Sequence, residues 1–108
     1  MGIPIKITDV IIPESARTGD AFGIEVRVRN NFWNRLWIAV AGRVYHYGGG
    51  YTGFTLSPDY VSVDGGATQL FTSSCVMGSG PISFEFWAYY WDGFKWVLDD
   101  ASDILVVH

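Results

Sequence analysis

Cysteine is almost absent from this sequence, which holds a single one, Cys75, among 108 residues. One cysteine excludes an internal disulfide bond and is too few for a cysteine-rich metal cluster. Because Cys75 falls in a strand-like stretch, we predict a small buried hydrophobic side chain there. Long hydrophobic runs are absent too, since no stretch approaches the ~20 apolar residues of a membrane-spanning helix. We therefore expect no membrane insertion.

Charged residues are also few, at 17%, and only 7 of them are basic, for a net charge of −4. Scattered basic residues and an acidic excess argue against a surface for nucleic acid or anionic lipid. The N-terminal residues run directly into a strand-like pattern, which predicts no secretory signal peptide. Gly2 does not fit a myristoylation site, because Lys6 stands where that motif has Ser or Thr.

Histidine is scarce, with His46 beside a glycine loop and His108 as the last residue. Nucleophilic catalysis needs a nucleophile, a base and an orienting group that converge in one pocket. Ser73, Ser74 and Cys75 lie in a strand-like stretch, where successive side chains point to opposite faces and do not converge. We therefore predict a protein that is not an enzyme and that carries no catalytic residues and no cofactor.

Four aspartates near the C-terminal end form the acidic cluster of the sequence: Asp92, Asp99, Asp100 and Asp103. Hard cations such as Ca²⁺ bind several closely spaced carboxylate and carbonyl oxygens, which makes a surface calcium site one hypothesis. The spacing differs from that of the twelve-residue calcium loop, and its glycine and terminal glutamate are missing. We favour solvated turns at these positions and predict no metal site, while the sequence leaves a bound cation open.

No stretch has the apolar spacing and capping residues of a helix. Apolar and polar residues instead alternate in short stretches, most regularly over 22–30, whereas both faces of 36–44 are apolar. The second pattern predicts a central strand with a covered outer face. A change of phase near Thr8 and Asp9, within a first strand over 3–12, predicts a β-bulge at a sheet edge.

Seven or eight strands fit the chain at a spacing of about 8–12 residues, which is typical of a β-sandwich. We therefore predict an all-β fold, an immunoglobulin-like antiparallel β-sandwich, as a single domain over residues 1–108. The segment 45–54 combines four glycines with tyrosines and is expected to be a loop. Residues 55–63 contain Pro58 and are expected to form a short edge element.

The stretch 82–98 contains two aromatic runs that meet at Asp92-Gly93. Asp-Gly between alternating apolar residues predicts a β-hairpin with a two-residue primed turn, which needs positive φ at both residues. In the first run Ile82, Phe84 and Phe86 share one face with Ala88 and Tyr90, and that face is expected in the core. We also expect Trp96, in the second run, to be a core or cross-strand packing residue.

The opposite face of the first run carries large aromatic side chains beside a glutamate, which packing within one small core explains less well. Tyrosine and tryptophan are enriched at interfaces, and their flat rings also stack on sugars. We predict a contact surface on this face and on the neighbouring glycine–tyrosine loop. Its candidate residues are Trp87, Tyr89, Trp91, Trp37, Tyr47, Tyr51 and Trp33. Covering of these rings by loops is the alternative.

Two parts of the chain are similar to known β-sandwich modules. The segments are Ile11-Ile12-Pro13, Gly19-Asp20-Ala21-Phe22 and 24–30 in the first half, and Val76-Met77, Tyr89-Tyr90-Trp91, Asp92-Gly93 and 96–100 in the second. The first half resembles CARDB-type, cell-adhesion-related immunoglobulin-like modules of bacteria and archaea, and the second resembles modules of archaeal surface and viral structural proteins. Gly78 departs from the proline usual after that methionine.

The resemblance implies a non-enzymatic structural or interaction module on an extracellular or virion surface. Its partners would be copies of itself or a larger surface or virion protein, bound through the aromatic strand face. The alternative is a carbohydrate-binding module that uses Tyr47, Tyr51, Trp33 or Trp91 as stacking platforms. A concave or flat aromatic strip with polar groups beside it would favour the second hypothesis.

Overall fold

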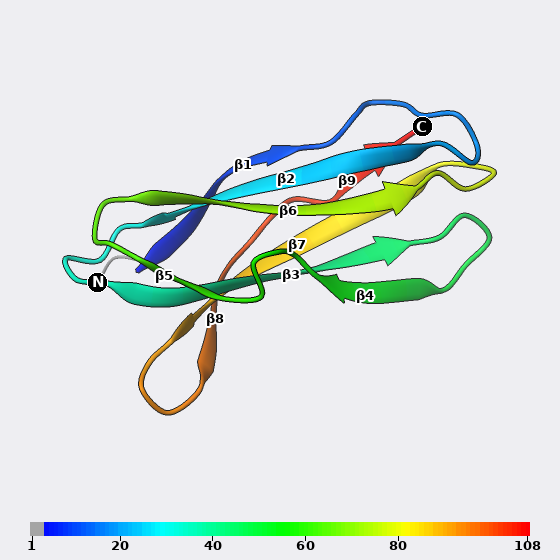
Figure 1. Ribbon diagram of the computed structural model, residues 1–108. Coiled ribbons are helices and arrows are strands. Elements are labelled where there is room, and N and C mark those ends of the chain that lie inside the picture. The colour runs from blue at the N-terminus through cyan, green and yellow to red at the C-terminus, as the bar shows by residue number, and fades with distance from the viewer. Residues whose placement is uncertain (1–3) are drawn as a thin grey trace.

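The computed structural model describes residues 4–108, and these form nine β-strands and no helix (Figure 1). The strands are β1 (Ile5–Ile11), β2 (Ala21–Asn30), β3 (Leu36–Tyr45), β4 (Tyr51–Thr55), β5 (Val61–Val63), β6 (Thr68–Val76), β7 (Ile82–Trp91), β8 (Trp96–Ala101) and β9 (Leu105–Val107). Among these residues there is accordingly no helix suited to crossing a membrane. Ile3, predicted to begin the first strand, lies outside the described residues.

The strands form two antiparallel sheets that pack face to face. Sheet A has the strand order β1-β2-β6, and sheet B has the order β4-β3-β7-β8, with β5 pairing with β3 and β9 with β7. Figure 1 shows sheet A as one layer and β3, β4 and β7 in the other. The all-β antiparallel sandwich predicted from the sequence is confirmed, and β3 is central in its sheet, as expected.

The described residues form nine strands rather than the seven or eight predicted. One extra strand comes from the glycine–tyrosine segment, whose second half forms β4 against β3. The three glycines before it, Gly48, Gly49 and Gly50, have φ values of 92°, 114° and 79°. Residues with a side chain rarely adopt such values, so the glycines allow the chain to reverse tightly between the two strands. This segment is therefore a hairpin, not only a loop.

Alternation along the strands places one continuous core between the sheets. The inward face of β7 is buried as predicted, with Ile82, Phe84, Phe86 and Ala88 each at most 3% exposed. Ile24, Val26 and Val28 of β2 meet it from sheet A and are equally buried. Side chains that alternate along a strand point to opposite faces, so the same alternation turns every second residue of β3 and β7 away from this core.

β1 is an edge strand with the predicted bulge. Its register against β2 shifts between Ile7 and Asp9. Two carboxylates of β8 cap the other side of the strand, where the Ile5 amide donates to Asp99 Oδ2 at 2.9 Å and the Ile7 amide donates to Asp100 Oδ2 at 2.8 Å. These aspartates therefore connect the edges of the two sheets by hydrogen bonds.

The turn between β7 and β8 differs from the prediction. Gly93 has φ of 102°, but no residue other than glycine has positive φ among those described, which excludes a two-residue primed turn at Asp92-Gly93. Trp91 instead pairs with Trp96 across a four-residue loop. Asp92 Oδ1 accepts hydrogen bonds from the amides of Phe94 and Lys95, so its side chain organises this longer loop.

Candidate binding site

The candidate site lies on the outer face of sheet B, the side that points away from the core. Residues of β3 and β7 that lie directly opposite each other share this face, as in the pairs Ala39–Tyr89 and Ala41–Trp87. The outward residues are Trp37, Ala39, Ala41, Arg43 and Tyr45 of β3, Glu85, Trp87, Tyr89 and Trp91 of β7, and Trp96 and Leu98 of β8. The central strand thus has small side chains in the middle of this face and aromatic ones at both ends.

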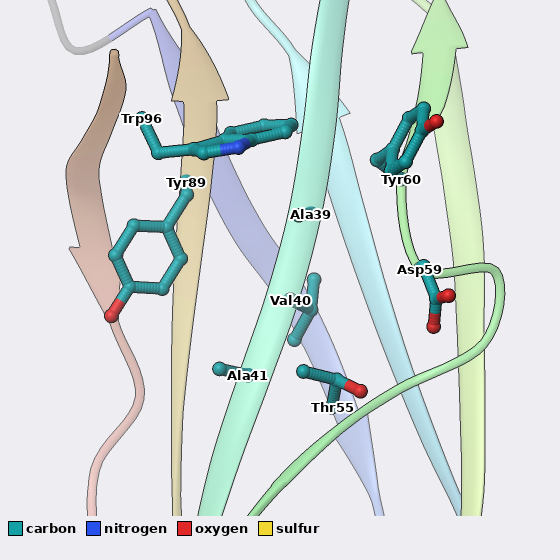
Figure 2. Close-up of a pocket in the computed structure, with 8 residues that line it drawn as sticks. All are labelled: Ala39, Val40, Ala41, Thr55, Asp59, Tyr60, Tyr89 and Trp96. Carbon is teal, nitrogen blue, oxygen red and sulfur yellow. The ribbon is translucent and has the colours of Figure 1, made fainter.

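Two alanines of β3 form the floor of an open groove of about 350 Å³. Figure 2 shows Trp96 and Tyr89 on one side of Ala39 and Ala41, and Tyr60 and Asp59 on the other. Tyr60 and Asp59 belong to the connection between β4 and β5, so segments from both flanks of β3 form the walls. A methyl group at each floor position leaves the space that a larger side chain would fill. We refer to this feature as the alanine-floored groove.

Four aromatic rings line a second open cavity of about 320 Å³, which shares Tyr60 and Trp96 with the groove. Trp37 and Trp91 complete it, and we call these four residues the aromatic box. Ring centroids are 5.7 Å apart for Trp37 and Tyr60, 6.3 Å for Tyr60 and Trp96, and 5.5 Å for Trp91 and Trp96. The corresponding interplanar angles are 67°, 53° and 66°, so neighbouring rings are steeply inclined to each other.

A second aromatic cluster surrounds Arg43 towards the β3–β4 hairpin. The guanidinium carbon lies 4.1 Å from the ring centroid of Tyr51 and 5.3 Å from that of Trp87, within cation–π range. The Tyr45 hydroxyl donates a hydrogen bond to Glu85 Oε1 at 3.1 Å. The charge of Arg43 is therefore held against aromatic rings on the outer face.

The structure brings together five of the seven predicted contact residues and separates the other two. Trp87, Tyr89, Trp91, Trp37 and Tyr51 all belong to strands of sheet B, on or beside the outer face. Trp33 lies in the β2–β3 loop, where it is 82% exposed and its ring contacts Phe32.

Tyr47 lies in the β3–β4 loop, and its ring packs on Gly80 of the β6–β7 connection. A Cβ atom added at Gly80 would come within 2.5 Å of that ring. Tyr47 also lines a small cavity with Cys75, Val76 and Ile82, at the junction of the two sheets. Its ring therefore takes part in packing between these connections, away from the groove.

Sequence reasoning missed two residues of the groove, Tyr60 and Trp96. Trp96 was expected to pack in the core or across strands; it packs across strands against Trp91, and it is 40% exposed on the outer face and not in the core. The cause is the hairpin register, because Trp96 faces the same side as its partner Trp91. Tyr60 follows Pro58 in a connection without regular alternation, so no periodicity indicated its direction. The small residues Ala39 and Ala41 between Trp37 and Arg43 were the one available signal of a hollow.

The side chains considered for catalysis or metal binding lie apart. His46 Nε2 lies 2.7 Å from Thr52 Oγ1 across the β3–β4 hairpin, and Cys75 is half-buried on β6, where burial raises the pKa of its thiol. Amide hydrogen bonds from Lys95 and Phe94 hold the pKa of Asp92 below its usual value. Asp99 and Asp100 cap β1. Over residues 4–108 no three His, Cys, Asp or Glu side chains are grouped to hold a metal ion.

Comparison with protein-family models gives no match, and comparison with curated proteins gives none either. Among solved structures, the alkylpurine DNA glycosylase AlkC of Pseudomonas fluorescens, bound to DNA containing an abasic site analog, superposes with a TM-score of 0.69 at 13% identity. The match covers 98% of this chain but only 31% of the glycosylase.

Two further structures share the fold. The C-terminal domain of Wzt matches with a TM-score of 0.67 and 19% identity, over 96% of this chain and 69% of that one. The seventh PapD-like domain of human CEP192 matches with a TM-score of 0.60 and 10% identity, over 97% and 84% of the two chains. Similarity at these identities concerns the fold alone, and it confirms an immunoglobulin-like β-sandwich.

Proposed function

We propose that this protein is a non-enzymatic structural or interaction module of an extracellular or virion surface. Its contact surface would be the outer face of sheet B, and its partners would be copies of itself or a larger surface or virion protein. The observation that carries the proposal is the group of exposed apolar side chains on this one face: Trp37, Tyr60, Trp91, Trp96 and Leu98 are each more than one-third exposed. The resemblance to CARDB-type modules is consistent with this role and stays a prediction.

Physical reasons favour a contact surface over a chance arrangement. Contiguous apolar patches beyond a few hundred Å² are uncommon on monomeric proteins and usually mark interaction sites. The molecule measures 44 × 22 × 22 Å, so a broad face has an area close to the ~800 Å² that each partner buries in a stable complex. The alanine-floored groove adds a concavity that a protruding partner side chain can fill, as interface hot spots do.

Self-association through this face can be measured by sedimentation velocity and light scattering from micromolar to millimolar concentrations. We expect the average mass to rise with concentration, and Leu98→Lys to abolish the rise because it introduces a charge into the face. Val76→Lys is the matched control, since Val76 is 60% exposed but lies on sheet A, whereas Leu98 is 52% exposed on sheet B. A strict monomer unaltered by Trp87→Ala, or equal loss with both lysine variants, would contradict assembly of copies through this face.

Carbohydrate binding is the second candidate, and the shape of the groove favours it. Trp96 and Tyr60 form its two walls, and Tyr89, Thr55 and Asp59 are lining residues that carry polar groups (Figure 2). Sugars use such sites by stacking on rings and hydrogen bonding at their rims. A glycan array with hits that disappear in Trp96→Ala would support this function. An array without hits, together with unchanged tryptophan fluorescence on addition of polysaccharides, would reject it.

The match to AlkC gives no reason to propose that this chain binds DNA. The shared part is under one-third of that protein, and this chain has a net charge of −4. Nucleic-acid binding depends largely on neutralising phosphates with clustered basic side chains. Arg27 and Arg29 lie on sheet A and Arg35 lies in the β2–β3 loop, all separated from Arg43 on the outer face of sheet B.

A further inference from the structure

We propose that the aromatic box of Trp37, Tyr60, Trp91 and Trp96 is a binding site for a quaternary ammonium group. The inference concerns part of the face assigned above as a contact surface, but it specifies a small cationic ligand. It depends on the arrangement of the four rings, on the chemistry of the cavity they line and on the charge beside it.

The four rings line one open hollow on the outer face, in a way that suits a compact cation. Consecutive centroids, from Trp37 to Tyr60 to Trp96 to Trp91, are 5.5–6.3 Å apart, and each ring is inclined by 53–67° to the next. Rings inclined in this way present faces as well as edges to the space between them. The ring faces of tryptophan and tyrosine carry partial negative charge and attract a cation within about 6 Å of the centroid. The box therefore offers several such faces to one ligand group.

The residues that line the aromatic box favour a quaternary over a primary ammonium group. The cavity is lined by these four aromatic residues, which provide ring faces and few hydrogen-bond acceptors. A primary ammonium group loses hydrogen bonds to water on entering such a cavity and regains few, which is unfavourable. A quaternary ammonium group has no N–H to satisfy, and its methyl groups pack on the rings. A volume of about 320 Å³ is ample for such a group.

Nearby charge favours a cation over a neutral molecule of the same shape. Asp59 lines the adjoining groove, next to the shared wall residue Tyr60, and its carboxylate is exposed. Lys95 is the basic residue closest in sequence to the box, but its charge lies near Asp92 and helps to lower the pKa of that carboxyl group. Asp59 is thus the one acidic side chain among the described residues that line the groove beside the box.

The test follows the five tryptophan indole N–H signals by NMR on the full chain, with tetramethylammonium chloride as the probe and sodium chloride to match ionic strength. We expect the signals of Trp37, Trp91 and Trp96 to shift and saturate, while those of Trp33 and Trp87 stay in place. Tert-butanol, an uncharged molecule of similar size, is expected to bind at least fivefold more weakly, the factor that about 1 kcal/mol of cation–π energy corresponds to. Equal shifts with tert-butanol, equal shifts at Trp33, or no shifts would overturn the proposal.

Variants confirm where the cation binds. Trp37→Leu removes one wall, at a side chain that is 48% exposed, and is expected to weaken tetramethylammonium binding by about fivefold. Trp33→Leu is the matched control and is expected to leave the affinity unchanged. Equal affinity of the Trp37→Leu variant and the original chain would overturn the assignment. Self-association through the outer face would cover the same four rings, so the titrations are carried out at a protein concentration where sedimentation velocity shows a monomer. Failure of the box and failure of the assembly proposal are then separate results.

A quaternary ammonium group can belong to a free solute or to a lipid headgroup, and two arms of the experiment distinguish these sources. Free choline is titrated by NMR, and vesicles of phosphatidylcholine are tested by co-sedimentation against vesicles of phosphatidylglycerol. Binding of choline without vesicle binding assigns a solute, whereas selective co-sedimentation with phosphatidylcholine assigns the headgroup. Binding of neither choline nor these vesicles would overturn the proposal.

Discussion

Asn30 shows how one side chain can stabilise a corner of the sandwich. It is completely buried at the end of β2, where its Nδ2 donates to the carbonyl oxygens of Asn34 and Val63 and its Oδ1 accepts from the Phe32 amide, all at 2.9 Å. Asn30→Leu has nearly the same size but leaves these backbone groups without a partner. We expect the free energy of unfolding to fall by about 3 kcal/mol, measured by chemical denaturation.

The neighbouring Asn34→Leu is the control for this residue-scale prediction. The Asn34 side chain accepts one hydrogen bond, from the exposed Arg35 amide, which water can replace. Its substitution is therefore expected to change the free energy of unfolding by no more than about 0.5 kcal/mol. Similar losses in the two variants would show that burial of the Asn30 amide is not what stabilises this corner.

Alternation predicted single residues well where a strand is regular, and poorly where a loop sets the direction of the next residue. Phe84 and Phe86 are buried as predicted, because β7 has a strict two-residue period. Tyr60 was not predicted, because it follows Pro58 in a connection without regular alternation, whereas Trp96 has one of the two roles expected for it, since it packs across strands against Trp91. The groove combines residues of β3, β7 and β8 with the β4–β5 connection, and their meeting depends on strand register, which the sequence does not encode locally.

At the scale of elements, the carboxylates of Asp99 and Asp100 protect the edge of β1. An edge strand exposes unpaired amides that can pair with another chain, and side chains that bind these amides reduce that tendency. In Asp99→Ala the Ile5 amide loses its acceptor, and in Asp100→Ala the Ile7 amide does. We expect hydrogen exchange of the corresponding amide to accelerate about tenfold, because a hydrogen bond to a carboxylate contributes about 1.4 kcal/mol or more.

Asp103→Ala is the charge-matched control for the edge of β1. It removes one negative charge close to β8 but no acceptor of the Ile5 or Ile7 amide, so exchange of both should stay as in the original chain. Acceleration in all three variants would indicate a general electrostatic effect instead of capping. Exchange that is unchanged in Asp99→Ala and Asp100→Ala would contradict the two hydrogen bonds.

Three elements were predicted from three different patterns: β2 from its strict alternation, β3 from apolar residues on both faces, and the bulged edge strand β1 from a change of phase. β4 was not, because its sequence begins after three glycines and holds a fourth, Gly53, and glycine weakens any strand pattern. Its pairing with β3 depends on positive φ values at Gly48–Gly50, which create the hairpin. Pairing with β3 therefore makes this segment a strand, although its local sequence does not favour one.

At the scale of the whole molecule, both sheets contribute to one cluster of buried side chains, which includes Phe71 of β6 and Phe86 of β7. If 1–108 is a single cooperative domain, loss of packing in either sheet must destabilise both. All five tryptophans lie in sheet B or in the β2–β3 loop, so tryptophan fluorescence reports on sheet B, whereas far-UV circular dichroism reports on both sheets.

Phe71→Ala removes a buried ring from sheet A, and we expect the free energy of unfolding to fall by about 3–5 kcal/mol. Because the two sheets share one core, the fluorescence and circular dichroism transitions of this variant should coincide and move together. Phe86→Ala, in sheet B, is the matched variant and should lower both transitions to a similar extent. A Phe71→Ala protein whose dichroism changes before its fluorescence would show that sheet A unfolds alone, and the sandwich would then consist of two separately stable layers.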